Sequence, residues 1–273
     1  SSDVCSSDLR NILLLFTFFA CITVQGQTPV RLVDLRSEHL DRPIGLDNPV
    51  PRLSWRMEDG RQGAVQTSWR IVVDEDSLNV VNGCGRMWDS GKNDSRNQLV
   101  AYAGKKLQPF TRYYWKVICS DMEYKETASP VSYFETGMMG MQHWQGAWIG
   151  DGKDIHYGPA PYFRKEFKTG KKVKSARAYI AAAGLYELYI NGEKIGDHCL
   201  APLYTRFDRR NLYVAYDVTS QLQNGDNAIG VLLGNGWYNH QSKAVWDFDR
   251  APWRNRPTFC LDLRITYTDG SVE

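Results

Sequence analysis

Short extended segments separated by turn residues recur along most of the chain, and this pattern constrains the fold more than any other feature. Turn-forming pairs such as Asn82-Gly83 lie between the segments. In the first half the predicted strands are residues 52–55, 68–73, 88–90, 113–119 and 131–136. After Gly150 the sequence predicts no helix of ordinary length. With 12% aromatic residues and 23 glycines, the chain is predicted to be all-β rather than a helical bundle.

Length and charge exclude several classes of protein. A chain of 273 residues is long enough for two domains that each bury a core. The 33 Lys and Arg residues against 31 Asp and Glu residues leave a net charge of only +2, and basic residues occur as isolated pairs such as Arg209-Arg210. Binding to nucleic acid or to an anionic membrane needs a concentrated basic face. We therefore expect neither nucleic acid nor membrane as a partner.

The N-terminal segment has the pattern of an export signal. Residues 12–24 are an apolar run that is too short for a membrane span but typical of a secretory signal, which predicts a signal peptide over residues 10–26 and a cut before Gln27. Lipoprotein processing at Cys21 and a buried core helix are the alternatives. Residues 1–9 contain no Met and no positive charge, so we interpret them as a non-native leader. The expected location is periplasmic or extracellular.

Four cysteines remain once the N-terminal segment is set aside: Cys84, Cys119, Cys199 and Cys260. None has the CxxC spacing of a structural zinc site. In an exported protein they could form one disulfide in each half. Buried free thiols are the interpretation we favour.

The first half contains one strongly patterned segment. In residues 107–117 a period of two places Tyr113 and Trp115 on the same side of an extended chain, together with Leu107, Pro109, Thr111 and Val117. The segment resembles the tyrosine-corner strand of fibronectin type III domains, in which a Tyr hydroxyl ties a crossover between sheets to the strand. We expect residues 30–137 to form a fibronectin type III-like or immunoglobulin-like sandwich. Residues 138–150, rich in Met and Gly, are interpreted as the boundary between domains.

The second half predicts an antiparallel jelly-roll β-sandwich over residues 145–273, complete or incomplete. Residues 178–190 are a long β-prone stretch with Gly184 as a predicted bend or bulge. The following Asn191-Gly192 pair is a strong hairpin signal. Further strands are predicted at residues 213–218, 228–233 and 261–267.

An ordered set of motifs in both halves resembles the N-terminal region of bacterial α-L-rhamnosidases. The set contains DNPVPRLSW at residues 47–55, residues 88–91, GLYELYINGEKIGD at 184–197, residues 200–202, 216–219 and 225–228, and LGNGWY at 233–238. The resemblance implies a parent glycoside hydrolase that releases terminal α-L-rhamnose from rhamnosides with inversion. In that family the catalytic carboxylates lie in an α/α toroid further along the polypeptide.

The resemblance also implies that this chain is an accessory region with no catalytic residue of its own. Its expected partners are rhamnose-containing glycans or glycosides and the catalytic domain of the same polypeptide. The carboxylates of the second half are expected to face solvent: Glu187, Asp197, Asp217 and Asp249.

One ligand site is implied by those relatives whose jelly roll holds rhamnose through a calcium ion. The matching residues here are Asn191 and Asn239 as metal and sugar ligands and Trp237 as a sugar contact. The acidic residue that precedes the turn asparagine in such relatives is Ile190 here. If the site exists, Asn191 and Asn239 should converge at one end of the sandwich. The alternatives are a turn role for Asn191 with Trp237 in the core, and a domain that acts only as a spacer.

Overall fold

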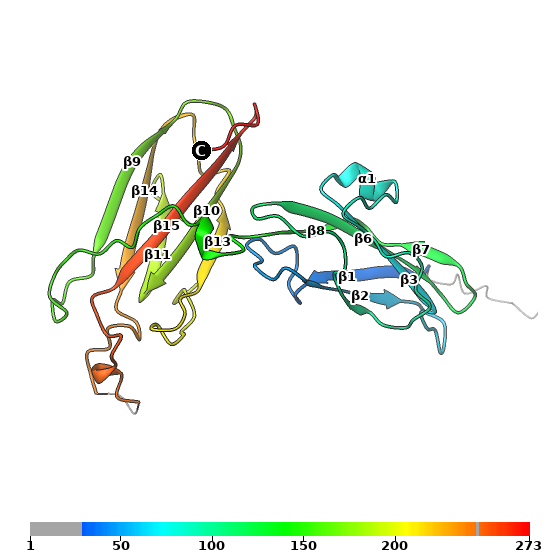
Figure 1. Ribbon diagram of the computed structural model, residues 1–273, viewed down its shortest axis with the longest axis horizontal. Coiled ribbons are helices and arrows are strands. Elements are labelled where there is room, and N and C mark those ends of the chain that lie inside the picture. Colours follow the sequence, from blue (N-terminus) through cyan, green and yellow to red (C-terminus); the bar gives the residue numbers. More distant parts are fainter. Residues whose placement is uncertain (1–28, 244–245) are drawn as a thin grey trace, which may run out of the picture.

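The computed structural model describes residues 29–243 and 246–273. The predicted leader and signal peptide lie outside these ranges. Two β-sandwiches follow one another along the long axis of the molecule and are joined by the chain that leaves β8 (Figure 1). The prediction of an all-β fold is confirmed. In the described ranges, no helix has the length and apolar character needed to cross a membrane.

The first sandwich has two antiparallel sheets and one short helix. One sheet has the order β1-β2-β5. The other has the order β4-β3-β6-β7, and β8 also pairs with β6. The bounds are β1 Arg31–Ser37, β2 Arg52–Glu58, β3 Ser68–Asp74, α1 Ser77–Val81, β4 Trp88–Asp89, β5 Leu99–Ala101, β6 Arg112–Ser120, β7 Glu126–Ala128 and β8 Ser132–Glu135.

The tyrosine corner predicted from the sequence is present. Tyr113 is fully buried, and its hydroxyl accepts a hydrogen bond from the Gln108 N–H at 2.8 Å. Trp115 is also fully buried, as expected for a core residue. The strand itself begins only at Arg112, because Phe110 adopts a left-handed conformation (φ 56°) that interrupts the extended chain.

The second sandwich also has two antiparallel sheets, with the orders β13-β10-β15 and β12-β11-β14-β9. Two single-turn 3₁₀ helices lie in the connections, η1 (Met141–His143) and η2 (Phe248–Arg250). The strand bounds are β9 Tyr162–Thr169, β10 Val173–Ala183, β11 Leu185–Ile190, β12 Glu193–Lys194, β13 Tyr213–Asp217, β14 Gly225–Gly234 and β15 Thr258–Tyr267.

Gly184 moves the chain from one sheet of this sandwich to the other. β10 pairs with β13 and β15, whereas β11, one residue later, pairs with β12 and β14. The glycine has φ 121°, and a Cβ there would lie 2.6 Å from the Gly234 carbonyl oxygen. The predicted bend is therefore a crossover between sheets. The predicted hairpin follows directly, since Asn191 and Gly192 have φ 52° and 85° and join β11 to β12.

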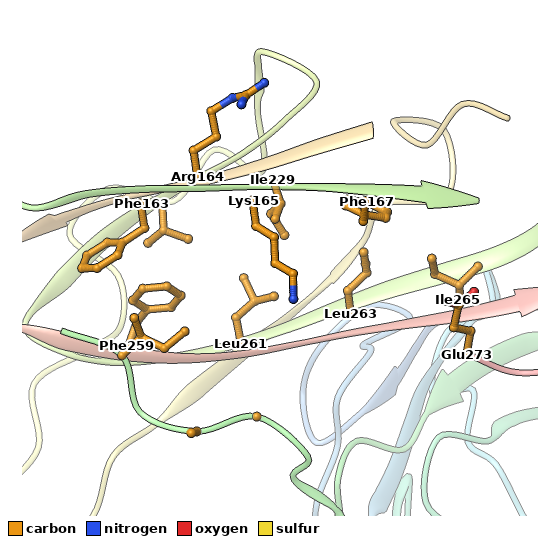
Figure 2. Close-up of a pocket in the computed structure, with 14 residues that line it drawn as sticks. Phe163, Arg164, Lys165, Phe167, Ile229, Phe259, Leu261, Leu263, Ile265 and Glu273 are labelled. Atoms are coloured by element: carbon orange, nitrogen blue, oxygen red, sulfur yellow. The ribbon is translucent and has the colours of Figure 1, made fainter. Parts of the chain in front are cut away.

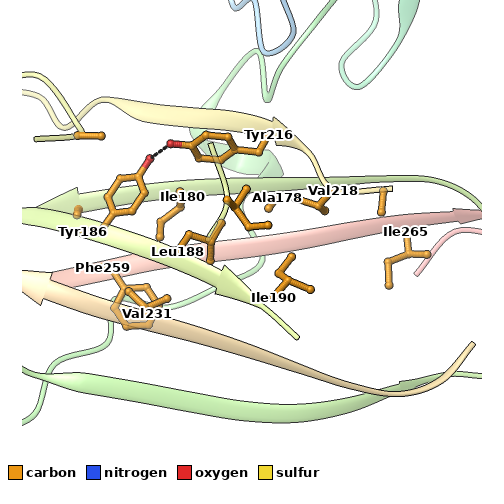
Figure 3. Packing of buried hydrophobic residues seen from close by; sticks show 14 of the residues in the cluster. Ala178, Ile180, Tyr186, Leu188, Ile190, Tyr216, Val218, Val231, Phe259 and Ile265 are labelled. Atoms are coloured by element: carbon orange, nitrogen blue, oxygen red, sulfur yellow. Dashed lines mark hydrogen bonds between the residues drawn. The ribbon is translucent and has the colours of Figure 1, made fainter. Parts of the chain in front are cut away.

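The core of the second sandwich lies between its two sheets (Figure 3). Ala178 and Ile180 from β10 pack opposite Leu188 and Ile190 from β11, and all four are buried. The hydroxyls of Tyr186 and Tyr216 lie 3.0 Å apart within this core and satisfy one another. This hydrogen bond closes the core on the side of β13.

Several elements were not predicted from the sequence, namely β1, β5, β7, β9 and the helix α1. β9 contains a run of charged residues, and the two aromatic residues of its inner face, Phe163 and Phe167, are only partly buried, so its apolar pattern is weak. All four cysteines in the described part of the chain are free. Cys119 and Cys260 are buried as expected, but Cys84 and Cys199 are exposed.

Candidate functional site

Asn191 is held by the backbone of its own sandwich. Its side-chain oxygen accepts the Ala228 N–H at 2.8 Å, and its amide nitrogen donates to the Gln221 carbonyl at 2.8 Å and to Oδ1 of Asn227 at 2.9 Å. The left-handed conformation of Asn191 is the one that the hairpin turn requires. The residue therefore stabilises the start of β14.

Asn239 is fully buried, which differs from the exposed loop position expected from the sequence. Its amide nitrogen donates to the Ile155 carbonyl at 2.9 Å and to Oδ1 of Asn235 at 3.2 Å. Its oxygen accepts a hydrogen bond from Nε of Arg254 at 3.1 Å. The side chain connects three loops and has no free oxygen aimed at solvent.

The structure does not bring the two asparagines together. Asn191 is bonded to Ala228 near the start of β14, whereas Asn239 is bonded to Asn235, directly after its end. At about 3.3 Å per residue, the strand from Ala228 to Gly234 alone spans roughly 20 Å. Calcium ligands lie about 2.3–2.6 Å from the ion, so one ion cannot contact both residues. The expectation that they converge is corrected accordingly.

Trp237 is partly exposed, with 42% of its surface accessible, so it is not a core residue. Its ring lies 5.3 Å from that of His240, 6.4 Å from that of Trp246 and 5.5 Å from that of Phe248. Trp246 is 69% exposed. These side chains form an aromatic cluster on the loops that follow β14.

A buried ion pair lies between the two sandwiches. Arg177 on β10 donates two hydrogen bonds to Glu135 on β8, at 2.7 and 3.0 Å, and both residues are more than 90% buried. Arg112 approaches the same carboxylate at 3.0 Å, and Asp217 lies 2.9 Å from Arg177. Burial alone would lower the pKa of Arg177, but its bonds to Glu135 raise it, so the guanidinium stays charged.

A second contact between the sandwiches is centred on Tyr213 of β13. Its hydroxyl donates to Oδ1 of Asp47 at 2.7 Å and accepts the Met138 N–H at 3.0 Å. We call Asp47, Glu135, Met138, Arg177 and Tyr213 the inter-sandwich seam. The sequence analysis did not select these residues as a group, although an arginine between two alanines of β10 was an available signal.

Of the four carboxylates expected to face solvent, Asp249 is half-buried instead, and its Oδ1 has no hydrogen-bond partner among the described residues. Glu187 is bonded to Lys194 and to the Tyr189 hydroxyl, and the lysine lowers the pKa of this carboxyl. Asp217 is paired with Arg177, and Asp197 is exposed. Within residues 29–243 and 246–273, no three His, Cys, Asp or Glu side chains gather as a metal site.

A cleft of about 680 Å³ lies between β9 and β15 of the second sandwich (Figure 2). Phe163 and Phe167 from β9 face Leu261 and Leu263 from β15 across it. Lys165 lies between the two phenylalanines (Figure 2). A lining that is mainly apolar suits a mainly apolar occupant.

Fold and seam together define an architecture in which an immunoglobulin-like sandwich is fixed to a second antiparallel sandwich. Residues 32–140 match the Rha78A-like, N-terminal immunoglobulin domain, and residues 171–273 match the alpha-L-rhamnosidase N-terminal domain. The chain therefore corresponds to the N-terminal region of proteins of the α-L-rhamnosidase family. The resemblance seen in the sequence is confirmed.

Individual relatives carry the same name. An alpha-L-rhamnosidase from Formosa agariphila is 32% identical over 96% of this chain and 31% of its own length. A solved alpha-L-rhamnosidase from Dictyoglumus thermophilum has a TM-score of 0.80 and 36% identity over 89% of this chain and 28% of that one. The Streptomyces avermitilis enzyme, solved with L-rhamnose, shares the fold (TM-score 0.80) at 21% identity, over 90% of this chain and 40% of its own. The chain thus spans about a third of the length of these relatives.

Proposed function

We propose that this chain is the accessory N-terminal part of a glycoside hydrolase that releases terminal α-L-rhamnose from rhamnosides with inversion. The observation that carries the proposal is the ordered match of its two sandwiches to two N-terminal domains of α-L-rhamnosidases about three times as long. Rhamnose-containing glycans or glycosides are the proposed substrates of the whole polypeptide. The apolar run at residues 12–24 supports an exported, periplasmic or extracellular enzyme.

The catalytic carboxylates are proposed to lie in another domain of the same polypeptide. An inverting glycosidase needs two carboxyl groups about 6.5–9.5 Å apart, with space between them for the sugar and a water molecule. Glu135 and Asp217 are engaged with Arg177, and the cleft between β9 and β15 is lined mainly by apolar side chains. This chain by itself is expected to be inactive.

The role that fits these two sandwiches is that of a rigid support. The buried Arg177–Glu135 pair would leave an uncompensated charge if the sandwiches separated, which is costly. Tyr213 and its partners add a second point of attachment. Two points of attachment resist hinge motion better than one, so the sandwiches would present the next domain in a fixed orientation.

An activity assay on two polypeptides tests the proposal. The chain as given and the longer product of its gene are incubated with an aryl α-L-rhamnoside, and the anomer first released is followed by proton NMR. We expect no turnover by the chain and release of β-L-rhamnose by the longer product. Turnover by the chain that is lost on replacing one of its own carboxylates would contradict the accessory role. An inactive longer product would contradict the assignment as a rhamnosidase.

A second candidate function, weak carbohydrate binding, is favoured by the exposed aromatic cluster around Trp237. Exposed aromatic rings offer flat apolar surfaces with a polar edge. We expect a dissociation constant on the order of 0.1–1 mM, that is about 4–5.5 kcal/mol. Calorimetry with L-rhamnose should give heat with the unmodified chain and none with Trp237→Ala. Equal heat from both would contradict a site at Trp237, and heat that disappears with a chelator would point to a calcium site elsewhere.

A further inference from the structure

The cleft between β9 and β15 is an open side of the second sandwich. β9 is the last strand of one sheet and β15 the last strand of the other, so two sheet edges lie next to each other with the cleft between them (Figure 2). Four partly buried side chains pack against the core cluster and line the cleft: Phe163, Phe167, Leu261 and Leu263. An apolar surface of this kind, bordered by a strand edge that is unpaired over part of its length, is a surface that another extended segment can cover.

The C-terminal residues have already begun to pair with the open edge of β15. After the turn at Gly270 (φ 85°), the chain reverses and the Tyr267 N–H donates to the Ser271 carbonyl at 2.9 Å. Ile265 and Glu273 then exchange two backbone hydrogen bonds, at 2.8 and 2.9 Å. This is the hydrogen-bonded pair of an antiparallel ladder. In the same register, the second residue after Glu273 would face Leu263.

The edge of β15 that does not pair with β10 is open at Leu263, but another segment pairs with it near the start of the strand. At the far end, Ile149 and Phe259 exchange two backbone hydrogen bonds, at 2.7 and 3.0 Å. The alternation of the ladder directs the N–H and C=O of Leu263 to the same edge as those of Ile265. In the described part of the chain, no backbone group pairs with Leu263 on that edge. The open length therefore suits a short strand that then leaves β15 and crosses the cleft.

The charge of Lys165 restricts which segments can cover the cleft. Its side chain projects into the cleft between two aromatic rings (Figure 2). No carboxylate of the described residues forms an ion pair with it, whereas its outward-facing neighbour Arg164 is paired with Glu166 at 2.7 Å. A segment that covers the cleft would bury part of this lysine, which is favourable only if the segment supplies an acceptor.

We propose that the cleft is the binding site of the polypeptide segment that directly follows Glu273 in the longer enzyme. The segment continues the antiparallel pairing along Leu263, places alternate apolar side chains between β9 and β15, and supplies a carboxylate or carbonyl oxygen to Lys165. The inference rests on the proposed function, because it requires a longer polypeptide. It makes the second sandwich dependent on the next part of the chain for its last strand.

The test compares the full chain with the same chain lengthened by about 20 residues encoded next in its gene, enough for a strand and a connection. The probe is the apolar anionic dye 1-anilinonaphthalene-8-sulfonate. We expect the dye to bind the shorter chain and to lose most of its fluorescence with the longer one. Hydrogen exchange at the Leu263 amide should slow by about tenfold or more in the longer chain.

Two variants in the cleft and one control on the opposite face of β9 locate the effect. Phe167→Ser should abolish dye binding by the shorter chain, whereas Lys168→Ser, on the opposite face of β9, should leave it unchanged. In the longer chain, Lys165→Glu should restore dye binding and fast exchange at Leu263, and this variant keeps the test valid if Phe167→Ser does not fold.

Three results would overturn the inference: unchanged dye binding and exchange in the longer chain, a stop codon directly after Glu273, or a cleft protected only in a dimer of the shorter chain. A longer enzyme that hydrolyses rhamnosides but leaves Leu263 unprotected would refute this inference alone. Protection at Leu263 in a complete but inactive polypeptide would instead refute the proposed function.

Discussion

The hydroxyl of Tyr213 lies 2.7 Å from Oδ1 of Asp47, although 166 positions separate the two residues in the sequence. The same hydroxyl accepts the Met138 N–H, so one atom of the second sandwich satisfies two groups of the first. Burial raises the pKa of Tyr213, and the phenol therefore stays protonated and able to donate. At this contact Gly45 comes so close to the second sandwich that a Cβ on it would lie 2.7 Å from the Ala215 Cβ.

Removing the Tyr213 hydroxyl should weaken the seam. Tyr213→Phe leaves the Met138 N–H without its partner and one hydrogen bond of Asp47 unmade, so we expect the free energy of unfolding to fall by about 1–3 kcal/mol. Denaturant unfolding measures this loss, and small-angle X-ray scattering should show a wider range of inter-sandwich orientations. Tyr162→Phe is the control, since Tyr162 is 78% exposed, and should change stability by less than about 0.5 kcal/mol. A Tyr213→Phe variant as stable as the unmodified chain would show that the contact contributes nothing.

Gly184 should not tolerate a side chain. In Gly184→Ala the new Cβ would lie 2.6 Å from the Gly234 carbonyl oxygen and 2.9 Å from the Pro257 Cβ, at a φ that L-residues rarely adopt. We expect a loss of about 2–4 kcal/mol in the free energy of unfolding. Gly158→Ala is the matched control because nothing lies within 4 Å of its Cβ position, and it should shift stability by about 1 kcal/mol or less. Equal effects of the two substitutions would contradict the crossover role of Gly184.

Asn239→Ala should destabilise the protein, contrary to what an exposed loop asparagine would do. The substitution removes the partner of the Ile155 carbonyl and of Arg254 in a buried position, so we expect a loss of about 1–3 kcal/mol. Thermal unfolding measures the effect. Gln241→Ala, two residues away and exposed, should be nearly neutral. An Asn239→Ala variant with an unchanged melting temperature would mean that these hydrogen bonds are dispensable.

Acid should destabilise the first sandwich through Asp74. Burial by itself would raise the pKa of this carboxyl. Hydrogen bonds from the Arg86 side chain and from the backbone N–H groups of Asp76 and Arg86 lower the pKa by more than burial raises it, so the pKa of Asp74 lies well below its usual range. Because the pKa is lower in the folded state than the roughly 3.9 of an unfolded chain, the charged form stabilises the fold above about pH 4. This contribution is lost as the pH falls through the folded pKa.

The measurement is the free energy of unfolding of the unmodified chain and of Asp74→Asn between about pH 7 and pH 2. We expect the variant to be less stable at neutral pH and the difference to shrink below about pH 4. Asp226→Asn is the control, because its ion pair with Lys168 is 80% exposed on both sides and contributes little at any pH. A difference that is constant across the whole range would contradict a folded-state role for the ionised Asp74.

Local sequence determined the features that depend on neighbouring residues. The alternation around Tyr113 predicted a buried strand with a tyrosine corner, and Asn191-Gly192 predicted the hairpin, because two-residue periodicity and positive φ are properties of short segments. The ordered motifs were enough to identify the family. β9 was missed because its pattern is charged, and its inner face is only partly covered by the described chain.

Tertiary structure decided every property that depends on residues distant in the sequence. Only the pairing of β11 with β14 shows that Asn191 and Asn239 lie at opposite ends of one strand, and only the packing of three loops shows that Asn239 is buried. Gly184 was predicted as a bend, but the sheet that each flanking strand joins could not be predicted. Arg177 and Glu135 are ordinary charged residues in the sequence, and they form a seam because two separate sandwiches exclude water from the same small volume.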